Sequence, residues 1–434
     1  MTDRIYENNS YIKEFRAQVV ACLPAGEAFS GWQDGEKGAW AVVLDQTAFF
    51  PEGGGQSADT GRLFCGGQST DTGRQAGKKS ASQAPGGNEQ GGPERAPGGF
   101  SEKTAFKVYD VQIKDGTVYH RTDLFAGKGT QILGKIDWEG RFSNMQQHSG
   151  EHIFSGLVHR HFGYDNVGFH LGSQAVTMDF NGLLTSGDID RIEWEVNEAI
   201  YKNVPITVSY PDEEALKTMA YRSKIEIQGQ VRIVTVEDYD VCACCAPHVA
   251  RTGEIGILKV VDVQKYKGGV RVSILCGGRA LLDYRKKQVQ GQNISRLLSA
   301  PEDGISQAAE RQLEENSRLR QKIYEMTRQL IIQKIEAIPK EQENIWFFEA
   351  EMDANTMRKT VNMALDRVSG YGGVFCGDDA SGYKYIIGTK TKDALKAAKV
   401  LKERFEARGG GKEEMVQGYV SALRKDIEGA LYSL

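Results

Sequence analysis

Alternation of apolar and polar positions dominates the first third of the chain. The segment AWAVVLDQTAFF (39–50) is apolar and rich in β-branched residues, and AFKVYDVQI (105–113) and TVYHRTDLF (117–125) flank the turn sequence KDG. A further apolar segment, TQILGKIDW, follows at 130–138. This pattern predicts a small all-β domain, a barrel or a sandwich, over residues 1–137.

A polar segment interrupts this pattern at residues 66–99. It contains ten glycines and no Val, Leu, Ile, Met, Phe, Tyr or Trp. Such a composition cannot bury enough apolar surface to offset the entropy of ordering. We therefore expect a disordered insertion that lengthens a connection between two strands and leaves the domain whole.

Helical and extended periodicities alternate after residue 138. Helical spacing covers 141–162 and 187–202, and a strand pattern lies between them near 174–181. Three more strand patterns follow: VRIVTVEDYD, IGILKVVDVQKY and GGVRVSILCG. The pattern predicts an α+β domain over residues 138–287.

A helical linker is predicted next, over residues 288–340. Within its helix at 306–338, apolar residues recur at spacings of four, three and four, as in a short coiled-coil seam: Leu319, Ile323, Met326 and Leu330. Pro339 ends the helix. Strand and helix patterns then alternate through 341–434, which predicts a compact α/β module. Two chains could pair through the helix or through this module.

Length and composition indicate a multidomain globular protein. The chain of 434 residues is long enough for about three domains. It has no run of eighteen apolar residues and no apolar signal core at its start, so we expect a cytoplasmic protein without membrane contact. Its seven cysteines, three of them at 242–245, fit thiolate ligation in a reducing compartment better than disulfides. A net charge of −4 argues against general nucleic-acid affinity but allows a local basic face.

Candidate metal chemistry begins with the stretch MQQHSGEHIFSG (145–156). His148 and His152 are four residues apart, so a helix would place both on one face. The metalloprotease motif H-E-x-x-H needs its glutamate directly after the first histidine, where this chain has Ser149. Glu151 projects to the other side of the pair. Protease chemistry is therefore not favoured, and a bare pair needs further ligands.

Those ligands occur in the stretch DVCACCAPHVARTGEIG. Cys244 and His248 form a second pair, and with His148 and His152 they supply three imidazoles and one thiolate, a plausible zinc donor set. The alternative is a set of buried cysteines and core histidines. Cys242 and Cys245 stay open as substitutes for Cys244.

Two further motifs have polar or basic character. In TAFFPEGGGQSADTG, the glycines Gly53, Gly54 and Gly55 allow close backbone approach, and Thr47 and Gln56 can hydrogen-bond a small polar group; a tight strand connection is the equal alternative. Residues 384–412 hold nine Lys/Arg against three Asp/Glu, and RGGGK (408–412) ends the run with a backbone expected to be flexible. Such clustering can neutralise phosphates, or it can be a solvated helix face.

Together these motifs resemble a known family. HSGEH, CCAPH followed by TGEIG, and the upstream TAFFPEGGGQSADTG resemble, in the same order, the editing domain of alanyl-tRNA synthetases and their free-standing relatives, the alanyl-tRNA editing proteins. RGGGKEEMVQGYV is similar to the glycine-rich signature of the DHH-associated domain. The family usually has C-G-G-T-H where this chain has C-C-A-P-H, and the insertion at 66–99 is unusual. The short stretch before the glycine motif leaves no room for an aminoacylation domain, so the long free-standing form is expected.

The resemblance implies a fold and an activity. It implies an N-terminal barrel, a zinc-binding α+β editing core, a helical linker and a C-terminal DHH-associated domain that binds tRNA through Arg408, Gly409, Gly410, Gly411 and Lys412. The activity would be hydrolysis of the ester that links serine or glycine to tRNA specific for alanine, with one zinc per chain. Thr47, Gly53 to Gly55 and Gln56 would contact the substrate.

The roles of the catalytic residues stay open at this stage. His148 and His152 would act with the metal, which could activate water or hold the substrate. Glu151 would orient an imidazole, or be a solvated helix carboxylate. The main alternative function is a non-catalytic tRNA-binding protein with a structural zinc. A DHH-type phosphoesterase is excluded because the chain has no Asp-His dipeptide.

Overall fold

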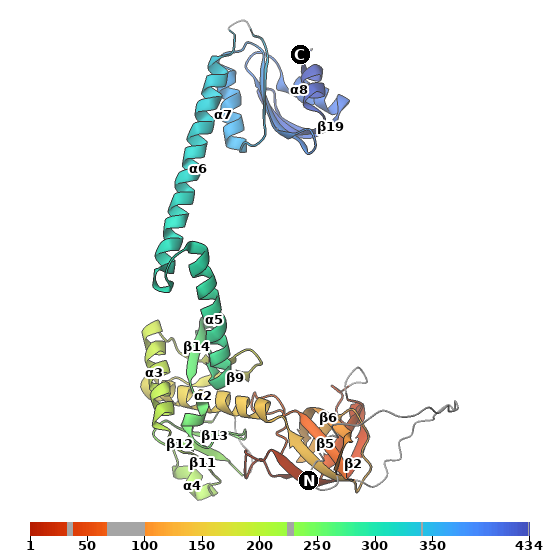
Figure 1. Cartoon of the computed structure of the whole chain (residues 1–434), viewed down its shortest axis with the longest axis vertical. Coiled ribbons are helices and arrows are strands. Elements are labelled where there is room, and N and C mark those ends of the chain that lie inside the picture. The colour runs from red at the N-terminus through yellow and green to blue at the C-terminus, as the bar shows by residue number, and fades with distance from the viewer. Residues whose placement is uncertain (33–37, 67–99, 224–229, 340–341, 433) are drawn as a thin grey trace, which may run out of the picture. The chain divides into compact units, whose positions relative to one another are not determined.

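The computed structural model describes residues 1–32, 38–66, 100–223, 230–339, 342–432 and 434, with the side chains of 100–104 left out. The chain divides into two compact units, Met1–Gln290 and Gly291–Leu434 (Figure 1). The predicted disordered insertion lies outside the described residues, except for Gly66. Because Gly66 pairs with Phe100, the insertion joins two neighbouring strands.

Six strands of the first unit close into a barrel in the order β2, β3, β7, β6, β5 and β8. Their bounds are Glu14–Pro24, Trp40–Leu44, Thr117–Thr122, Phe100–Lys114, Gly61–Gly66 and Gln131–Ile136. Beside them lie the short elements β1 (Asp3–Arg4), β4 (Gln46–Thr47) and α1 (Ala25–Ala28). Alternate side chains point inward, as Val118, His120 and Thr122 do on β7. The predicted N-terminal barrel is confirmed, and the sandwich alternative is wrong.

A histidine lies inside this barrel. The Nδ1 of His120 donates to the carbonyl oxygen of Val42 at 3.0 Å, because a carbonyl can only accept. The Nε2 of His120 therefore accepts from the hydroxyl of Thr47, at 2.8 Å. The ring is fully buried, and this burial lowers the pKa of His120 to about 4. The imidazole is neutral in the folded barrel at neutral pH.

We expect His120 to make the protein sensitive to acid. Its pKa is about 4 when folded against an ordinary value of 6.5, so its contribution to stability is complete above pH 6.5 and is lost as the pH falls towards 4. Because each pH unit between the two values is worth about 1.4 kcal/mol, the loss approaches about 3 kcal/mol. Chemical denaturation at pH 7 and pH 4.5 measures it. A His120→Gln variant should lack this part of the pH dependence, and equal pH dependence in both proteins would contradict the assignment.

The rest of the first unit combines two sheets with two longer helices. A four-stranded sheet has the order β14, β15, β10, β9, and a three-stranded sheet has the order β11, β12, β13. The strand bounds from β9 to β15 are Asn166–Leu171, Val176–Phe180, Ile206–Ser209, Ile233–Val236, Asp240–Ala243, Leu258–Tyr266 and Gly269–Cys276. The helices are α2 (Trp138–Phe162), α3 (Ser186–Lys202) and the short α4 (Glu213–Thr218), with a 3₁₀ turn at Thr252–Ile255.

Helix α2 is the central element of this region. Its N-cap Asp137 directly follows the barrel strand β8, so the helix leaves the barrel and runs between the sheets (Figure 1). It ends at Gly163, which takes the left-handed conformation at φ 68°. Gly150 lets the helix approach strand β15 closely, because a Cβ there would lie 2.4 Å from the Sγ of Cys276. The middle of α2 is thus buried on several sides.

Helical structure begins earlier than the helical linker predicted from residue 288, because a helix follows strand β15 at once. Helix α5 spans Gly277–Leu298 and crosses the expected boundary at residue 287. Only Gly277 and Ala280 of this helix are buried, and its apolar residues Leu281, Leu282 and Leu297 are exposed. The polar surface of α5 gave no clear amphipathic period, which explains why its start was missed.

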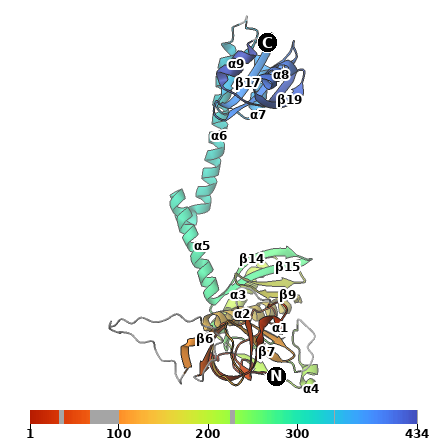
Figure 2. The same ribbon diagram turned by 90° about the vertical axis from the view of Figure 1, so that its right-hand side faces the viewer.

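The second unit is built on a five-stranded sheet in the order β16, β17, β18, β20, β19 (Figure 2). The strand bounds from β16 to β20 are Ile345–Glu349, Tyr371–Asp378, Gly382–Thr389, Glu406–Lys412 and Met415–Ser421. One face packs on α8 (Ala394–Arg404) and α9 (Arg424–Leu431). The other face packs on α7 (Ala354–Ala364) and on the end of α6 (Ile305–Glu336), which follows a 3₁₀ turn at Glu302–Gly304.

One local prediction in this unit is wrong. The segment RGGGK, expected to be flexible, lies in strand β19, where it pairs with strand β20. Gly409 lies opposite Gly418, and a Cβ on Gly409 would come within 2.8 Å of the Tyr385 hydroxyl oxygen. Gly409 and Gly411 therefore serve close packing at the edge of the sheet, while a side chain at Gly410 would meet open space.

The structure as a whole is a mixed α+β protein, as the sequence predicts. Its N-terminal barrel and its later helices agree with the expected order of elements. Across the described residues, no helix combines the length and the apolar character that a membrane span requires.

Candidate metal centre

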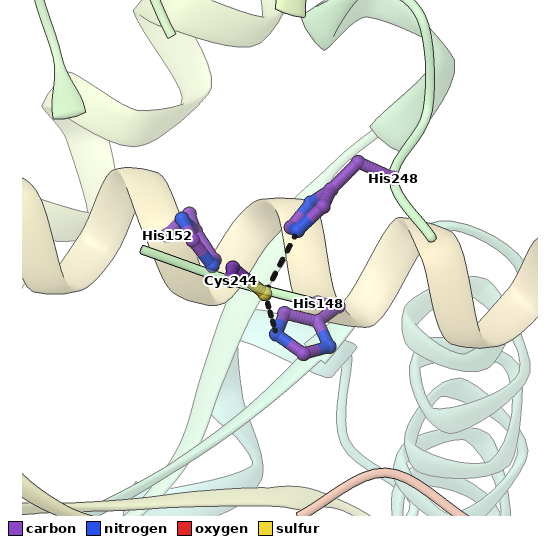
Figure 3. Close-up of side chains that lie close together, drawn as sticks. All are labelled: His148, His152, Cys244 and His248. Atoms are coloured by element: carbon purple, nitrogen blue, oxygen red, sulfur yellow. Dashed lines mark hydrogen bonds between the residues drawn. The ribbon is translucent and has the colours of Figure 1, made fainter. Parts of the chain in front are cut away.

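Four side chains from two distant segments meet inside the first unit. His148 and His152 lie on α2, while Cys244 and His248 lie on the loop that follows strand β13 (Figure 3). One donor atom of each lies within 4.8 Å of the others. The Sγ of Cys244 is 3.5 Å from the Nε2 of His148 and 3.4 Å from the Nε2 of His248. All three imidazoles are buried, and Cys244 is half-buried.

Each imidazole has an outer partner at Nδ1. The Nδ1 of His148 is 2.9 Å from the Oε1 of Gln56. The Nδ1 of His152 is 2.9 Å from the Oδ2 of Asp240. The Nδ1 of His248 is 3.0 Å from the Oγ of Ser149. Because the outer nitrogen of every ring is engaged, the inner nitrogen Nε2 is left for the centre of the cluster.

The spacing of the donors fits a zinc ion. Tetrahedral zinc with bonds of about 2.3 Å to sulfur and about 2.0 Å to nitrogen holds these donors about 3.5 Å apart. The two Nε2 to Sγ distances are 3.5 and 3.4 Å. Imidazole and thiolate are also the donors that zinc prefers in proteins. All four residues therefore have the chemistry that zinc prefers, and the two pairs that include Cys244 Sγ have the separation that it requires.

The loop that carries Cys244 and His248 is held by neighbouring side chains. The Nη1 of Arg232 donates to the carbonyl oxygens of Cys244, at 2.7 Å, and Ala246, at 3.1 Å. The hydroxyl of Ser10 donates to the carbonyl oxygen of His248 at 3.0 Å. These contacts fix the C-C-A-P-H backbone without the two glycines that C-G-G-T-H contains.

The other two cysteines of this stretch have different positions. Cys242 is buried and groups with His152 and Asp240, on the outer side of that imidazole. The Sγ of Cys245 faces the glycine motif, 3.6 Å from where a Cβ on Gly54 would lie. Only Cys244 joins the group of three imidazoles. Burial raises the pKa of the Cys244 thiol to about 12, so binding a metal there would displace a proton.

Glu151 lies beside the cluster on α2. It is fully buried, which excludes a solvated helix carboxylate. Its Oε1 accepts hydrogen bonds at 2.7 Å from both the Ser155 hydroxyl and the Asn166 side-chain amide. These bonds tie α2 to strand β9. The Nδ1 atoms of the HxxxH pair contact Gln56, for His148, and Asp240, for His152.

The glycine motif reaches the cluster through one side chain. Gly54 and Gly55 have φ values of 60° and 80°, and a Cβ on Gly55 would lie 2.7 Å from the carbonyl oxygen of Phe169. This turn directs Gln56 to His148. The Nε2 of Gln56 is buried and has no hydrogen-bond partner among the described residues. A buried amide donor without a partner is costly in a folded protein and marks a place for a ligand.

Thr47, the other polar residue of the motif, lies in the barrel. It is fully buried, and its hydroxyl donates to His120 and accepts from the backbone N–H of Phe49 at 3.1 Å. The structure thus places Gln56 beside the His/Cys cluster. The hydroxyl of Thr47 is engaged in hydrogen bonds inside the barrel.

A buried ion pair links the motif to α2, and the sequence analysis missed it. The Nε of Arg141 lies 3.0 and 2.9 Å from the two carboxylate oxygens of Asp59. Arg141 also donates to the carbonyl oxygens of Ala48, at 2.6 Å, and Ser10, at 3.0 Å. Both charged side chains are buried. Asp59 stands in the quoted motif, but its partner lies 82 residues away, and no spacing rule connects them.

Asp240 is a buried carboxylate within a polar network. Its carboxylate contacts both His152 and Arg222, and their charges and hydrogen bonds lower its pKa against the opposing effect of burial. Neither Asp240 nor Ser149 was identified from the sequence, although both stand within a few residues of predicted ligands. Ser149 is adjacent to His148 in the sequence but contacts His248, 99 residues away, so a local rule would not have paired them.

The predicted tRNA-binding residues lie in the second unit. Arg408, Gly409, Gly410, Gly411 and Lys412 are all exposed on edge strand β19. The Arg408 guanidinium lies over the ring of Tyr419, 5.6 Å from its centre. Both basic side chains are therefore accessible to a large partner.

Comparison with known proteins supports the expected resemblance. Residues 231–273 match the family model described as the threonyl and alanyl tRNA synthetase second additional domain. The chain is 25% identical to the alanyl-tRNA editing protein AlaX-L of Pyrococcus horikoshii, across 98% of this chain and 96% of that protein. It is 23% identical to the alanyl-tRNA editing protein Aarsd1 of Danio rerio, across 97% and 95%.

The synthetases match over part of their length. The chain is 26% identical to the alanine–tRNA ligase of Pyrococcus abyssi, over 98% of this chain but only 43% of that ligase. The resemblance to long alanyl-tRNA editing proteins and to part of alanyl-tRNA synthetase, which the sequence motifs predict, is thereby confirmed.

Proposed function

We propose that the protein hydrolyses the ester bond that links a wrong amino acid, serine or glycine, to tRNA specific for alanine. The observation that carries this proposal is the contact between His148 Nδ1 and Gln56 Oε1, which joins the metal-ligand cluster to the glycine motif. The similarity to proteins named for alanyl-tRNA editing supports the reaction and its tRNA. The enzyme is an aminoacyl-tRNA deacylase.

His148, His152, Cys244 and His248 would hold one zinc ion per chain. Bound there, zinc supplies Lewis-acid chemistry, polarising a carbonyl or lowering the pKa of water. The residues around it would hold the imidazoles in place. Gln56 and Asp240 offer acceptor oxygens to the Nδ1 atoms of His148 and His152, and the Ser149 hydroxyl contacts the Nδ1 of His248. The Nε2 atoms of the three rings would then be left to bind the metal.

Gln56 would contact the aminoacyl group. Its Oε1 is held by His148, which leaves its Nε2 as a buried donor without a partner among the described residues. A substrate carbonyl or hydroxyl oxygen would satisfy this donor. A site that bonds a hydroxyl disfavours the analogue without one, which is how serine would be told from alanine. The turn at Gly53, Gly54 and Gly55 lets the backbone come close to such a ligand. For Thr47 to contact the substrate, its hydroxyl would have to break its hydrogen bond to His120.

The rival function is a non-catalytic tRNA-binding protein with a structural zinc. Four protein donors within 4.8 Å would suit a closed structural site. The unpartnered amide of Gln56 favours the enzyme, because a purely structural site needs no free donor beside the metal.

Amino-acid release distinguishes the two functions. Alanine tRNA charged separately with serine, glycine and alanine is incubated with the protein, and the free amino acid is measured over time. The enzyme releases serine or glycine far faster than alanine. Binding without release of any of the three would establish the passive function instead.

Residues 341–434, within the second unit, would be the DHH-associated domain that binds the tRNA. Arg408 and Lys412 are exposed on β19, and this strand closes the basic segment 384–412. Charge on an accessible strand edge can neutralise phosphates of the tRNA backbone. The division into a barrel, an editing core, a linker and this domain at residues 137, 287 and 340 is part of the same proposal.

Neutralising this edge should weaken tRNA binding. We expect the Arg408→Ala, Lys412→Ala variant to bind tRNA less tightly and to lower the slope of log affinity against log salt by about 1 for each residue. Turnover at saturating tRNA should change little. Binding across a salt series, with single-turnover deacylation, measures both effects.

A matched variant controls for net charge. Arg318→Ala with Lys322→Ala removes two exposed basic residues from α6 in the same unit. An unchanged salt slope in the β19 variant, or an equal loss in both variants, would assign the tRNA contact elsewhere.

Two chains would pair through helix α6 or through the C-terminal domain. The apolar residues of the predicted seam, Leu319, Ile323, Met326 and Leu330, are all exposed on this helix. Exposed apolar residues at coiled-coil spacing are typical of a helix that packs on a partner. Sedimentation of the full chain tests this pairing.

The reaction itself would take place in the cytoplasm.

A further inference from the structure

The three imidazoles of the cluster have chemically different outer partners. His148 faces an amide oxygen of Gln56, and His248 faces the hydroxyl of Ser149. His152 faces a carboxylate oxygen of Asp240 at 2.9 Å. A carboxylate partner makes an imidazole a stronger electron donor and fixes its tautomer more firmly than a neutral partner does. His152 therefore has a charged outer partner.

Asp240 is itself held by an arginine. The Nε of Arg222 donates to Oδ1 of Asp240 at 2.7 Å, and its Nη2 donates to Oδ2 at 3.0 Å. The Oδ2 atom therefore accepts from both Arg222 and His152. Asp240 is buried, and the side chain of Arg222 is mostly buried. The carboxylate has no freedom to rotate without breaking one of these bonds.

The backbone places Arg222 firmly beside strand β13. Its N–H donates to the carbonyl oxygen of Val241 at 2.8 Å, and its carbonyl oxygen accepts from the N–H of Ala243 at 2.9 Å. Strand β13 begins at Asp240 and leads directly into Cys244. Arg222, Asp240 and the loop with two metal ligands thus form one connected unit.

We propose that Asp240, held in place by Arg222, is a positioning residue of the metal centre that acts through His152. The inference rests on the proposed metal site. Asp240 accepts the Nδ1 proton of His152, so that Nε2 is free to bind the metal. Arg222 fixes the plane of the carboxylate and thereby the orientation of the ring.

An asparagine at position 240 cannot replace the carboxylate. Asparagine has one acceptor oxygen, whereas His152 and Arg222 together offer three N–H groups to both oxygens of Asp240. If the side-chain nitrogen of the asparagine faces Arg222, its N–H groups point at the N–H groups of the arginine, and no hydrogen bond forms there. With its nitrogen towards His152, the ring must carry its proton on Nε2, the atom that binds metal. Either arrangement weakens the metal site while the volume of the side chain is kept.

The test measures zinc affinity in the full chain by competition with a chromophoric chelator. We expect Asp240→Asn to bind zinc about 10 to 100 times more weakly than the wild type. Asp240→Glu, which keeps the carboxylate, should recover part of this loss. Arg222→Lys keeps the positive charge but cannot donate to both carboxylate oxygens of Asp240 at once. Its zinc affinity should therefore fall less than that of Asp240→Asn. The absorption spectrum of bound Co²⁺ should shift in the Asn variant, which reports a changed ligand geometry.

Asp179→Asn serves as the matched control. Asp179 accepts a similar fork from Arg271, at 2.6 and 2.8 Å, in the same unit, and it is not among the grouped metal ligands. Melting of the metal-free proteins shows how far each variant is destabilised. We expect weaker zinc binding only for Asp240→Asn, and a loss of zinc affinity that exceeds what its change in melting temperature explains.

Two failures can be told apart. A wild type that binds no zinc would overturn the metal site itself. A wild type that binds zinc tightly, with Asp240→Asn binding it equally well and giving the same Co²⁺ spectrum, would overturn the role of Asp240 alone. Equal loss of zinc affinity in Asp179→Asn and Asp240→Asn would also overturn it, because the effect would then be a general loss of stability.

Discussion

A Cys244→Ala variant is expected to lose both its bound zinc and its deacylase activity. Cys244 is the only thiol grouped with the three imidazoles among the described residues, and its Sγ lies within 3.5 Å of the Nε2 of both His148 and His248. Without it, three neutral rings remain and the cation loses its anionic ligand. We expect a fall in the rate of serine release of roughly 10² to 10³-fold or more, as for the loss of other electrostatic stabilisers.

Metal analysis and single-turnover deacylation measure the two losses on one preparation. Cys22→Ala is the matched control, because Cys22 is also a half-buried free cysteine of the first unit and lies in barrel strand β2. It should keep full zinc and full activity. A His148→Ala, Cys244→Ala double variant that still carried a full equivalent of zinc would reject the ligand assignment.

An Arg141→Met variant is expected to destabilise the first unit by about 3 to 5 kcal/mol. Arg141 and Asp59 are both buried, and the guanidinium also bonds the carbonyl oxygens of Ala48 and Ser10. Removing the arginine leaves a carboxylate charge in a site that water does not reach. Because Asp59 belongs to the glycine motif, the loss should loosen the attachment of that motif to α2.

Calorimetry of the full chain measures this loss as a lower melting temperature of the first unit. An Asp59→Asn, Arg141→Met double variant should recover part of the stability, since no unpaired charge remains. A single variant that melts within about 1 kcal/mol of the wild type would contradict the structural importance of the pair. Recovery in the double variant would separate the charge effect from the loss of packing.

The members of the His/Cys cluster could be predicted from the sequence because helix geometry is local. His148 and His152 are four residues apart, so any helix there places them on one face. Cys244 and His248 are likewise close in sequence. That the two pairs meet depends on the packing of strand β13 against α2, which no local spacing encodes. The resemblance to a known family supplied that link.

The outer partners of the ligands could not be predicted in the same way. Asp240 is 88 residues from His152, and Gln56 is 92 residues from His148. Many Asp and Gln side chains in the sequence are equally polar, and only the fold places these two against the imidazoles. The same holds for Arg141, which sequence reading would place on the solvent side of a helix but which the fold buries completely.

The C-terminal glycines illustrate the opposite error. Three consecutive glycines usually mark a loop, and the sequence therefore predicted a flexible segment. In the structure they form an edge strand because Gly409 faces Gly418 across the pair and both lie close to the Tyr385 hydroxyl. Glycine is needed where the backbone packs closely against an aromatic ring, just as it is needed in a tight turn.

The most direct test of the central proposal is the rate of serine release as a function of bound zinc. The full chain is stripped with a chelator, restored with zinc in steps from none to one equivalent, and mixed with serine-charged and alanine-charged alanine tRNA. The account predicts a serine-release rate that rises in proportion to bound zinc and levels off at one equivalent, with slow alanine release throughout. Equally fast serine release by the zinc-free protein would contradict it.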